Sequence, residues 1–410
     1  MEARGMDPYF KNLGQSVLNE WKKRNFSLEA FPQIAVTSLK KAPPSKCVDL
    51  EVLIRDFLLN DDQPGQTHSG FGEPELIVFE HPRFYIQILF WLDGTTDIHQ
   101  HEFSGAFHVM AGSSLHAEFV FDHARNITPY LRTGDLRMKN VEILENGATR
   151  PITSGREDIH SLFHLETPSV TVVVRTQNDP GTGPQFTYLP PHIALDPVYS
   201  DALTMRRKQL LDLLERTEED AYAGLVSEML ADLDFERGFY ILQNCMGRLK
   251  ELEAWSPAVK AFKRKHGRMA SGVEATIEES ARRDVIKDLR AMVTDPNHRF
   301  FLALLMNINS CDQLLDLVAR RYPGAKPADT VLGWIGELAE PTRDGIAVLD
   351  AFFPAKGSIG SHFEEVMADF RKLLHEIPTS GKGHPPKSPD RFRRVIAKSS
   401  MRVLMVSGKN

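Results

Sequence analysis

Between residues 75 and 190 the sequence is a series of short runs rich in β-branched and aromatic residues. Turn-forming segments such as DGTTD, AGSS, ENGAT and NDPGTG separate these runs. The runs themselves read ELIVF, FYIQILFW, AFHVMA, LHAEFVF, VEIL, DIHSLFHLE and SVTVVVRT. Many short strands joined by close turns are typical of an antiparallel sandwich or barrel, whereas parallel βαβ units need a helix between strands. This part of the chain is therefore predicted to be all-β.

Helical periodicity is found on both sides of the β region. Before it, apolar residues recur every three or four positions over residues 9–23 and 48–60. After it, the same spacing recurs throughout residues 195–376, where several segments open with Ser or Asp as an N-cap. The sequence thus predicts an α+β protein with four parts: a helical lead-in (1–73), an antiparallel β-barrel (74–192), a large all-α domain (195–378) and a basic, Pro/Gly-rich linker and tail (379–410).

The charge balance and the cysteines narrow the class of protein. Acidic residues outnumber basic ones by 55 to 49, which argues against a globally basic nucleic-acid-binding protein. The sequence has no apolar run of membrane-spanning length and no signal-peptide pattern at its start. Its three cysteines (Cys47, Cys245 and Cys311) are widely spaced and form no disulfide framework. We expect a cytoplasmic protein with no membrane partner.

The pair His99 and His101 is the chemically most informative motif. Residues i and i+2 of a strand project from the same face, so this HxH step places two imidazoles side by side. Neutral imidazole is a ligand for iron, zinc, copper and nickel, and an open catalytic site needs about three protein donors. His160, on a later strand, is the best third ligand. The alternative is a surface pair or a hydrogen-bonded core pair.

The segments ILFW, IHQH, VMAG, SSLHAEF and IHSLFHLETPSVTVVV resemble the cupin superfamily, and within it the cysteine dioxygenase (thiol dioxygenase) branch. The resemblance covers residues 76–190 and implies a cupin-type antiparallel β-barrel. It also implies that His99, His101 and His160 bind one metal ion. That ion is Fe(II) in the thiol dioxygenases, and Zn, Ni or Mn are the alternatives.

The chain also departs from this family. Most cupins add a glutamate four or five positions after the second histidine, where this chain has Gly105 and Ala106. A three-histidine site is therefore implied. The cysteine that crosslinks to a tyrosine in cysteine dioxygenases is missing at the same place, and the tyrosine position falls near Arg175. The resemblance therefore implies the metal site without implying cysteine as the substrate.

Other candidate pocket residues follow from strand parity. Arg175 is a candidate for binding an anionic substrate group, which guanidinium does well, although it equally fits a surface charge at a strand end. The resemblance to cysteine dioxygenases implies a further arginine that holds the substrate carboxylate, and Arg83 is the nearest candidate for it. His108 shares a face with Ala106 and Met110, the face we expect to look inward, and is a candidate second-sphere or catalytic residue. His164 has the parity of His160 and is a candidate substrate contact. Both histidines equally fit hydrogen-bonded core positions. Tyr188 is a candidate catalytic residue or rim packing, and His116 and His123 are expected at the surface.

These features lead to one functional hypothesis and two alternatives. The hypothesis is a mononuclear non-haem iron oxygenase in which Fe(II), a small and anionic or sulfur-containing substrate and O₂ meet at the three histidines. The first alternative is a non-oxidative isomerase, lyase or hydrolase that uses Zn, Ni or Mn. The second is a regulatory protein whose barrel senses a metal or small ligand and whose helical domain binds a partner. The helical domain is also a candidate homodimer interface.

Two further features lie towards the C-terminus. His362, Glu365 and Asp369 share one helical face, which we interpret as solvated because no second helix offers an ExxH partner. The tail from Gly381 carries eight Lys and Arg residues against Asp390 alone. It fits a contact to nucleic acid or acidic lipid, an added strand built from RVIAK or MRVLMVS, or a flexible end.

Overall fold

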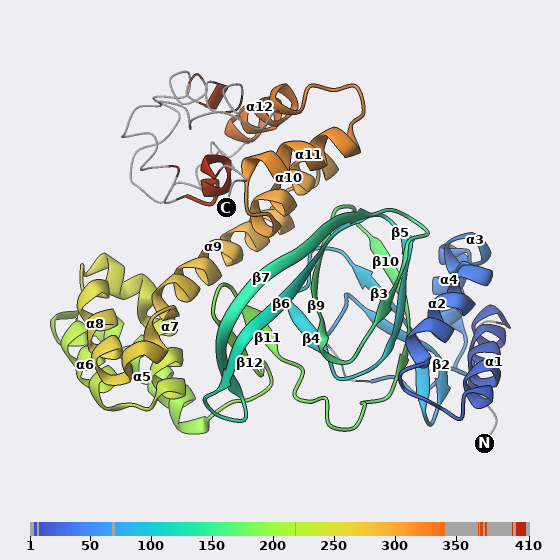
Figure 1. Cartoon of the computed structure of the whole chain (residues 1–410), viewed down its shortest axis with the longest axis horizontal. Coiled ribbons are helices and arrows are strands. Elements are labelled where there is room, and N and C mark those ends of the chain that lie inside the picture. Colours follow the sequence, from blue (N-terminus) through green and yellow to red (C-terminus); the bar gives the residue numbers. More distant parts are fainter. Residues whose placement is uncertain are drawn as a thin grey trace.

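The computed structural model describes residues 4–5, 8–67, 70–217 and 219–340. Nearer the C-terminus it describes Ala368, Phe370, Arg371, Leu374, Ile396 and residues 399–406. Two antiparallel β-layers form its centre, and helices cover the outer face of each (Figure 1). The α+β class, with a barrel after N-terminal helices and a helical region behind it, is confirmed.

The first layer is a six-stranded sheet in the order β1-β2-β3-β10-β5-β8. Its central strand β10 pairs with β3 on one side and with β5 on the other, both antiparallel. Its strands are β1 (Arg4–Gly5), β2 (Glu75–His81), β3 (Phe84–Trp91), β5 (Gly105–Ala111), β8 (Thr149–Ile152) and β10 (Ser169–Thr176).

The second layer is a closed barrel in the order β11-β12-β7-β6-β9-β4, with β11 pairing back onto β4. Its longest strands, β6 and β7, run side by side as a hairpin. Its strands are β4 (His99–His101), β6 (Ser114–Asn126), β7 (Leu131–Leu144), β9 (Gly155–His164), β11 (Thr187–Leu189) and β12 (Ile193–Leu195).

The N-terminal helices cover the outer face of the six-stranded sheet. They are α1 (Pro8–Lys23), α2 (Phe31–Lys41), α3 (Pro44–Cys47) and α4 (Leu50–Leu59). The helix expected over residues 9–23 is confirmed as α1, whereas α2 and α3 were not predicted. Alternate residues of β3, namely Phe84, Ile86, Ile88 and Phe90, join the core beneath α1 and α2. Their neighbours Tyr85, Gln87, Leu89 and Trp91 therefore face the interior between the two layers.

The helices after the barrel form two groups. The first group packs around its own core, together with Leu131 and Ile193 of the barrel, and consists of α5 (Ala202–Thr217), α6 (Glu219–Asp232), α7 (Phe235–Glu251) and α8 (Trp255–His266). The short 3₁₀ helix η1 (Gly267–Ala270) leads into the second group. That group covers the outer face of the closed barrel and consists of α9 (Val273–Met292), α10 (Pro296–Asn307), α11 (Cys311–Arg321) and α12 (Pro327–Ala339).

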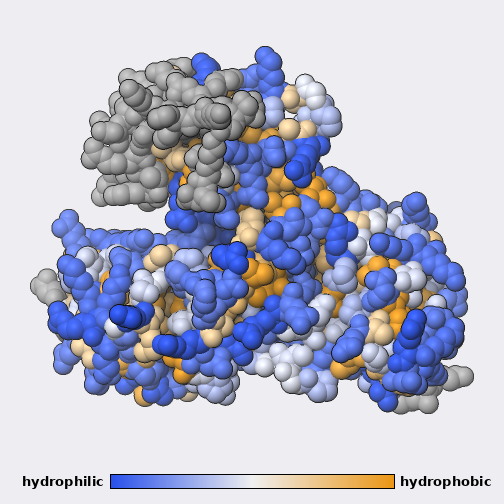
Figure 2. Space-filling model, viewed as in Figure 1, coloured by the Kyte–Doolittle hydropathy of each residue, from blue (hydrophilic) through white to orange (hydrophobic). Residues whose placement is uncertain are grey.

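The helix α9 connects the two groups and crosses the barrel on the way (Figure 1). In the space-filling view, polar side chains cover most of the described surface, and apolar ones gather where α9 and α10 meet the barrel (Figure 2). Arg283 is buried in this contact. Its Nη1 donates to Met306 O at 2.7 Å, and its Nη2 lies 3.3 Å from Oδ1 of Asn307. The same Oδ1 accepts from Ser161 of β9 at 3.4 Å, so α10 is bonded to the strand that carries His160.

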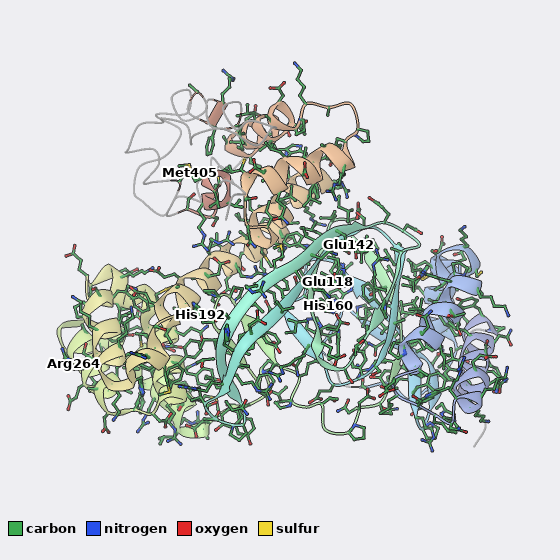
Figure 3. The ribbon with its side chains drawn as sticks, viewed as in Figure 1. Glu118, Glu142, His160, His192, Arg264 and Met405 are labelled. Atoms are coloured by element: carbon green, nitrogen blue, oxygen red, sulfur yellow. The ribbon has the colours of Figure 1, made fainter. Side chains whose placement is uncertain are left out.

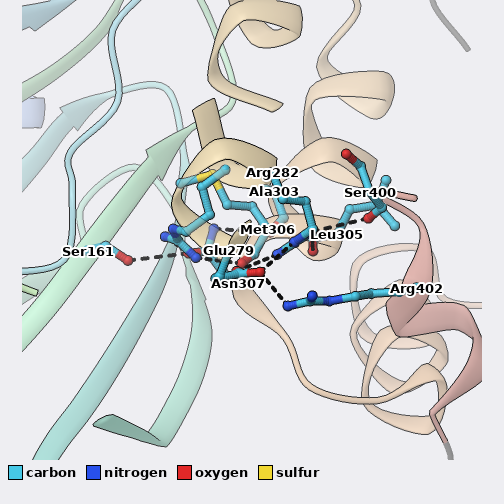
Figure 4. Close-up of polar contacts among 10 residues, drawn as sticks. Ser161, Glu279, Arg282, Ala303, Leu305, Met306, Asn307, Ser400 and Arg402 are labelled. Atoms are coloured by element: carbon cyan, nitrogen blue, oxygen red, sulfur yellow. Dashed lines mark hydrogen bonds and ion pairs between the residues drawn. The ribbon is translucent and has the colours of Figure 1, made fainter. Parts of the chain in front are cut away.

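The C-terminal segment 399–406 packs against the second helical group. Arg282 donates to Ser400 O at 3.1 Å, and Arg402 pairs with Glu279 of α9 (Figure 4). Arg402–Met405 is a 3₁₀ helix, η4, with Val403 and Leu404 buried. The strand expected from MRVLMVS is therefore wrong here, because its apolar residues fill a helical core. The face formed by His362, Glu365 and Asp369, and the tail between Thr379 and Ser399 apart from Ile396, lie outside the described residues.

None of the described helices combines the length and the apolar character required to cross a lipid bilayer.

A substitution at Gly105 tests how closely β5 packs against β10. A Cβ at this residue would overlap the backbone carbonyl oxygen of Val174 on β10. We expect Gly105→Ala to destabilise the protein by about 1–3 kcal/mol, because backbone must move to make room. The control is Gly333→Ala in α12, where a Cβ meets open space and the helix should gain about 1 kcal/mol. Chemical denaturation of both variants measures this, and equal stabilities would contradict the register of β5 on β10.

Candidate metal centre

The structure brings together the three histidines that the sequence singled out. His99 and His101 lie on β4, and His160 lies directly opposite His99 on β9. Their potential ligand atoms all lie within 4.8 Å of one another, and Nε2 of His101 is 2.8 Å from Nε2 of His160. All three side chains are buried between the two β-layers. No other such group of three His, Cys, Asp or Glu residues is found in the described parts of the chain.

The hydrogen bonds of these rings fit a metal ion. Nδ1 of His99 lies 2.8 Å from the carbonyl oxygen of Asp97, to which it donates, so its Nε2 presents a lone pair to the cluster. That Nε2 is buried and has no hydrogen-bond partner among the described residues. Burial, together with the neighbouring rings, holds the pKa of His101 and of His160 well below its usual value. Neutral imidazoles with converging lone pairs are the form that binds a divalent transition metal.

A cavity of about 340 Å³ opens onto the three histidines. Trp91, Phe103 and Phe107 form aromatic walls, and within the described parts of the chain no carboxylate joins the histidine cluster. Glu102 turns away from the cluster and accepts a hydrogen bond from Asn178. The full lining is Thr67, Phe71, Glu75, Tyr85, Gln87, Leu89, Trp91, Thr96, His99, His101, Phe103, Phe107, Ile152, His160, Leu162, Thr171, Val173, Arg175 and Gln185.

Arg175 lies in this cavity, as expected for a substrate-binding residue. Its guanidinium carbon is 3.4 Å from the centre of the Phe103 ring and 4.9 Å from that of Tyr85. Its Nε makes one long hydrogen bond, of 3.4 Å, to the carbonyl of Thr176. No ion pair of Arg175 is found among the described residues, and burial lowers the pKa of its guanidinium. A partly buried cation with unused donors, supported by an aromatic face, is suited to bind an oxyanion.

Gln87 is a cavity residue that the sequence analysis missed. Its side chain is 2% exposed, and its Oε1 has no hydrogen-bond partner among the described residues. A buried amide oxygen left unpaired costs about 1–3 kcal/mol, so its place in a cavity points to a ligand that would satisfy it. The available signal was a single amide in the otherwise apolar run FYIQILFW.

His108 does not face the interior, and the expectation that it does is wrong. Ala106 and Met110 belong to the core beneath the N-terminal helices, and His108 shares their face. Its Nδ1 lies 2.8 Å from Thr149 Oγ1, and its Nε2 lies 2.9 Å from Ser45 Oγ on α3. The other face of β5, with Phe107, lines the cavity. Both faces of this strand are covered, so its sequence does not show which one is interior.

Three other candidates lie outside the cavity lining. Arg83 is in the turn between β2 and β3, where its guanidinium lies 4.4 Å from the centre of the Phe26 ring. His164 is buried, stacks on Trp91 with 4.6 Å between ring centres, and lies 2.9 Å from Ser114 Oγ. Tyr188 is buried, and its hydroxyl donates to Gln100 Oε1 at 2.6 Å.

His116 was expected at the surface, and this is wrong: the residue is only 3% exposed. Its Nε2 lies 2.9 Å from Nδ1 of His160, and its Nδ1 lies 3.2 Å from Oε1 of Glu142. His160 and Glu142 are labelled in Figure 3. Arg150 donates to both carboxylate oxygens of Glu142, at 2.8 and 2.5 Å. In the segment LHAEFVF, polar residues alternate with apolar ones, which puts His116 and Glu118 on the same face of the strand. Only the pairing of β6 with β9 shows that His116 faces the interior. His123 is exposed, as expected.

Comparison with known proteins adds little to this site. No protein-family model matches the chain, and no curated protein sequence matches it. One solved structure that it resembles is the DMSP lyase DddQ from Ruegeria pomeroyi DSS-3. The match covers 43% of this chain and 95% of that chain, at 16% identity and a TM-score of 0.23. A likeness at this level bears on neither reaction nor substrate.

The histidine cluster gives a direct prediction. His99→Ala and His160→Ala should each abolish stoichiometric metal binding, because each removes one of three donors that converge on a single point. Elemental analysis of the purified and metal-reconstituted proteins measures this. His108→Ala is the matched control, a buried histidine outside the cluster, and should retain the metal. Full metal content in both cluster variants would refute the site.

Proposed function

We propose that this protein is a mononuclear non-haem metal enzyme, with Fe(II) as its metal, that oxygenates a small organic anion. The observation that carries the proposal is the convergence of three neutral imidazoles on an aromatic-walled cavity that also holds Arg175, which has no ion pair among the described residues. Iron is proposed because imidazole is among its preferred ligands and because the sequence resembles thiol dioxygenases. When bound, Fe(II) supplies redox chemistry with O₂ at its open coordination positions.

The protein's own residues would bind and orient the substrate. Arg175 would hold an anionic group through two parallel N–H bonds, with its guanidinium fixed against Phe103. The amide of Gln87 would accept from a hydroxyl or amine of the same molecule. Trp91 and Phe107 would cover its apolar part and exclude water. A cavity of about 340 Å³ is at the small end of ligand sites, which supports a small metabolite as the substrate.

A second candidate is a non-oxidative lyase, isomerase or hydrolase at the same metal site. Tyr85 and Glu75 favour it, because both line the cavity and can carry a proton. Burial raises the pKa of Tyr85, which keeps the phenol protonated and suits it to act as an acid rather than as a base.

Oxygen dependence separates the two candidates. The protein would be loaded anaerobically with Fe(II), Zn(II), Ni(II) or Mn(II) and supplied with a panel of small amino, hydroxy, keto and thiol acids. We expect turnover with Fe(II) alone, together with O₂ uptake and incorporation of ¹⁸O from ¹⁸O₂ into the product. Turnover that is unchanged without O₂ would replace the oxygenase with the non-oxidative candidate. Metal-independent ligand binding without turnover would support a sensor.

Arg175→Gln should weaken substrate binding by about 10- to 100-fold, because a charge-assisted pair contributes about 1.5–3 kcal/mol. Arg175→Lys should recover only part of this, since an ammonium keeps the charge but loses the planar fork. The matched control is Arg83→Gln, in the β2–β3 turn, for which we expect wild-type binding. Titration of the iron-loaded protein with the acid identified above measures the three affinities, and wild-type affinity in both Arg175 variants would contradict the role.

Gln87→Leu separates stability from binding. Removing the unpaired buried amide should raise the free energy of unfolding by about 1 kcal/mol or more. The same change should weaken binding of the substrate, because its hydrogen-bond partner is lost. Thermal unfolding without ligand and titration with ligand measure the two effects. A less stable variant that binds normally would show that Gln87 has a structural partner instead.

A further inference from the structure

We infer that His116, Glu142 and Arg150 are positioning residues of the metal centre, which fix the tautomer of His160 and make it the strongest of the three ligands. This rests on the proposed metal site. The three residues come from β6, β7 and β8, and together they form an unbroken series of hydrogen bonds that begins at His160. None of them lines the cavity, so they act through His160 rather than on a substrate.

The direction of each hydrogen bond follows from its end point. A guanidinium can only donate, so Arg150 donates to both carboxylate oxygens of Glu142. This carboxylate is the charged end of the series. Hydrogen bonds from Arg150 and His116 lower the pKa of Glu142 to about 2, so it is an anion at neutral pH and accepts from Nδ1–H of His116. Because Nδ1–H of His116 is donated to Glu142, its Nε2 is the atom that accepts from His160.

Because Nε2 of His116 accepts this hydrogen bond, Nδ1 of His160 must carry the proton that is donated. The Nε2 of His160 is then left as the unprotonated atom, and it is the atom that lies 2.8 Å from Nε2 of His101 in the cluster. A histidine that donates its second N–H towards a carboxylate is a more basic ligand and is held in one orientation. The rings of His116 and His160 are nearly perpendicular, with 5.1 Å between their centres, which further fixes the His160 plane.

The other two histidines lack such support. Nδ1 of His99 donates to an uncharged backbone carbonyl. Nδ1 of His101 is buried without a partner among the described residues. Within the part of the chain that the structure describes, His160 alone of the three is linked to a charged group through hydrogen bonds. The site is therefore asymmetric, and its metal affinity should depend on His116 and Glu142 although neither touches the metal.

The test measures metal affinity rather than turnover. Apparent dissociation constants for Co(II) would be determined by competition with a chromophoric chelator, and the Co(II) absorption spectrum would be recorded for each variant. His116→Phe keeps the ring volume and removes the acceptor, and it should weaken binding by about 10- to 100-fold. His116→Gln restores an acceptor and should recover most of the affinity. Glu142→Gln removes the charge. Its Co(II) affinity should lie between those of His116→Phe and His116→Gln, and its Co(II) spectrum should be shifted.

His108→Phe is the matched control. It too removes a buried histidine with two hydrogen bonds, but one that lies on the outer face of its sheet, and it should bind Co(II) as the wild type does. Wild-type affinity and spectrum in His116→Phe would overturn the inference, as would equal losses in the Phe and Gln variants. If His116→Phe does not fold, wild-type binding by Glu142→Gln overturns it. Co(II) binding that is retained in the His99→Ala variant refutes the metal site itself, which is a different result.

Discussion

The structure depends on keeping three imidazole rings uncharged and close together in a buried interior. A charged ring there would cost several kcal/mol of desolvation and would repel its neighbours, so burial and mutual repulsion both favour the neutral form. Neutral rings leave buried nitrogens to be satisfied. One is satisfied by a backbone carbonyl and one by His116, and the converging Nε2 atoms are those that a metal ion would satisfy.

This interior is possible because helices cover both outer faces of the β-layers. The outward residues of β3 and β10 are more apolar than the inward ones: Ile86, Ile88, Val172 and Val174 lie beneath α1 and α2, while Gln87, Thr171 and Arg175 line the cavity. The closed barrel shows the same division. Leu115, Ala117 and Phe119 of β6 belong to the core shared with the helices after the barrel, and His116 faces inward. The hydrophobic effect therefore stabilises the two cores in which helices pack on the outer faces of the β-layers. Polar side chains are left to line the cavity between the layers.

The same division explains what the sequence could and could not predict. Strands, the helix of residues 9–23 and the cluster of His99, His101 and His160 were predictable, because they depend on local periodicity and on an HxH step with one downstream histidine. His108 and His116 were assigned to the wrong faces. A strand covered on both sides gives no parity signal, and a polar face was taken as the solvated one. The pairing of β6 with β9, which joins His116 to His160, depends on contacts between residues 44 positions apart. Arg175 was predictable as a polar residue at a strand end, whereas its aromatic support from Phe103 was not.

Helix α9 has one more consequence. Arg290, fully buried, donates from Nε to the carbonyl of His164, the last residue of β9, and from Nη1 to that of Leu92, which directly follows β3. These backbone carbonyls therefore accept hydrogen bonds from α9, a helix that begins more than a hundred residues after the end of β9. Cutting the chain after the last strand would leave these carbonyls without their donors and would strip the apolar cover from β6. The scaffold of the histidine cluster therefore extends beyond the strands that carry the histidines, and a protein engineered from these strands must include α9 as well.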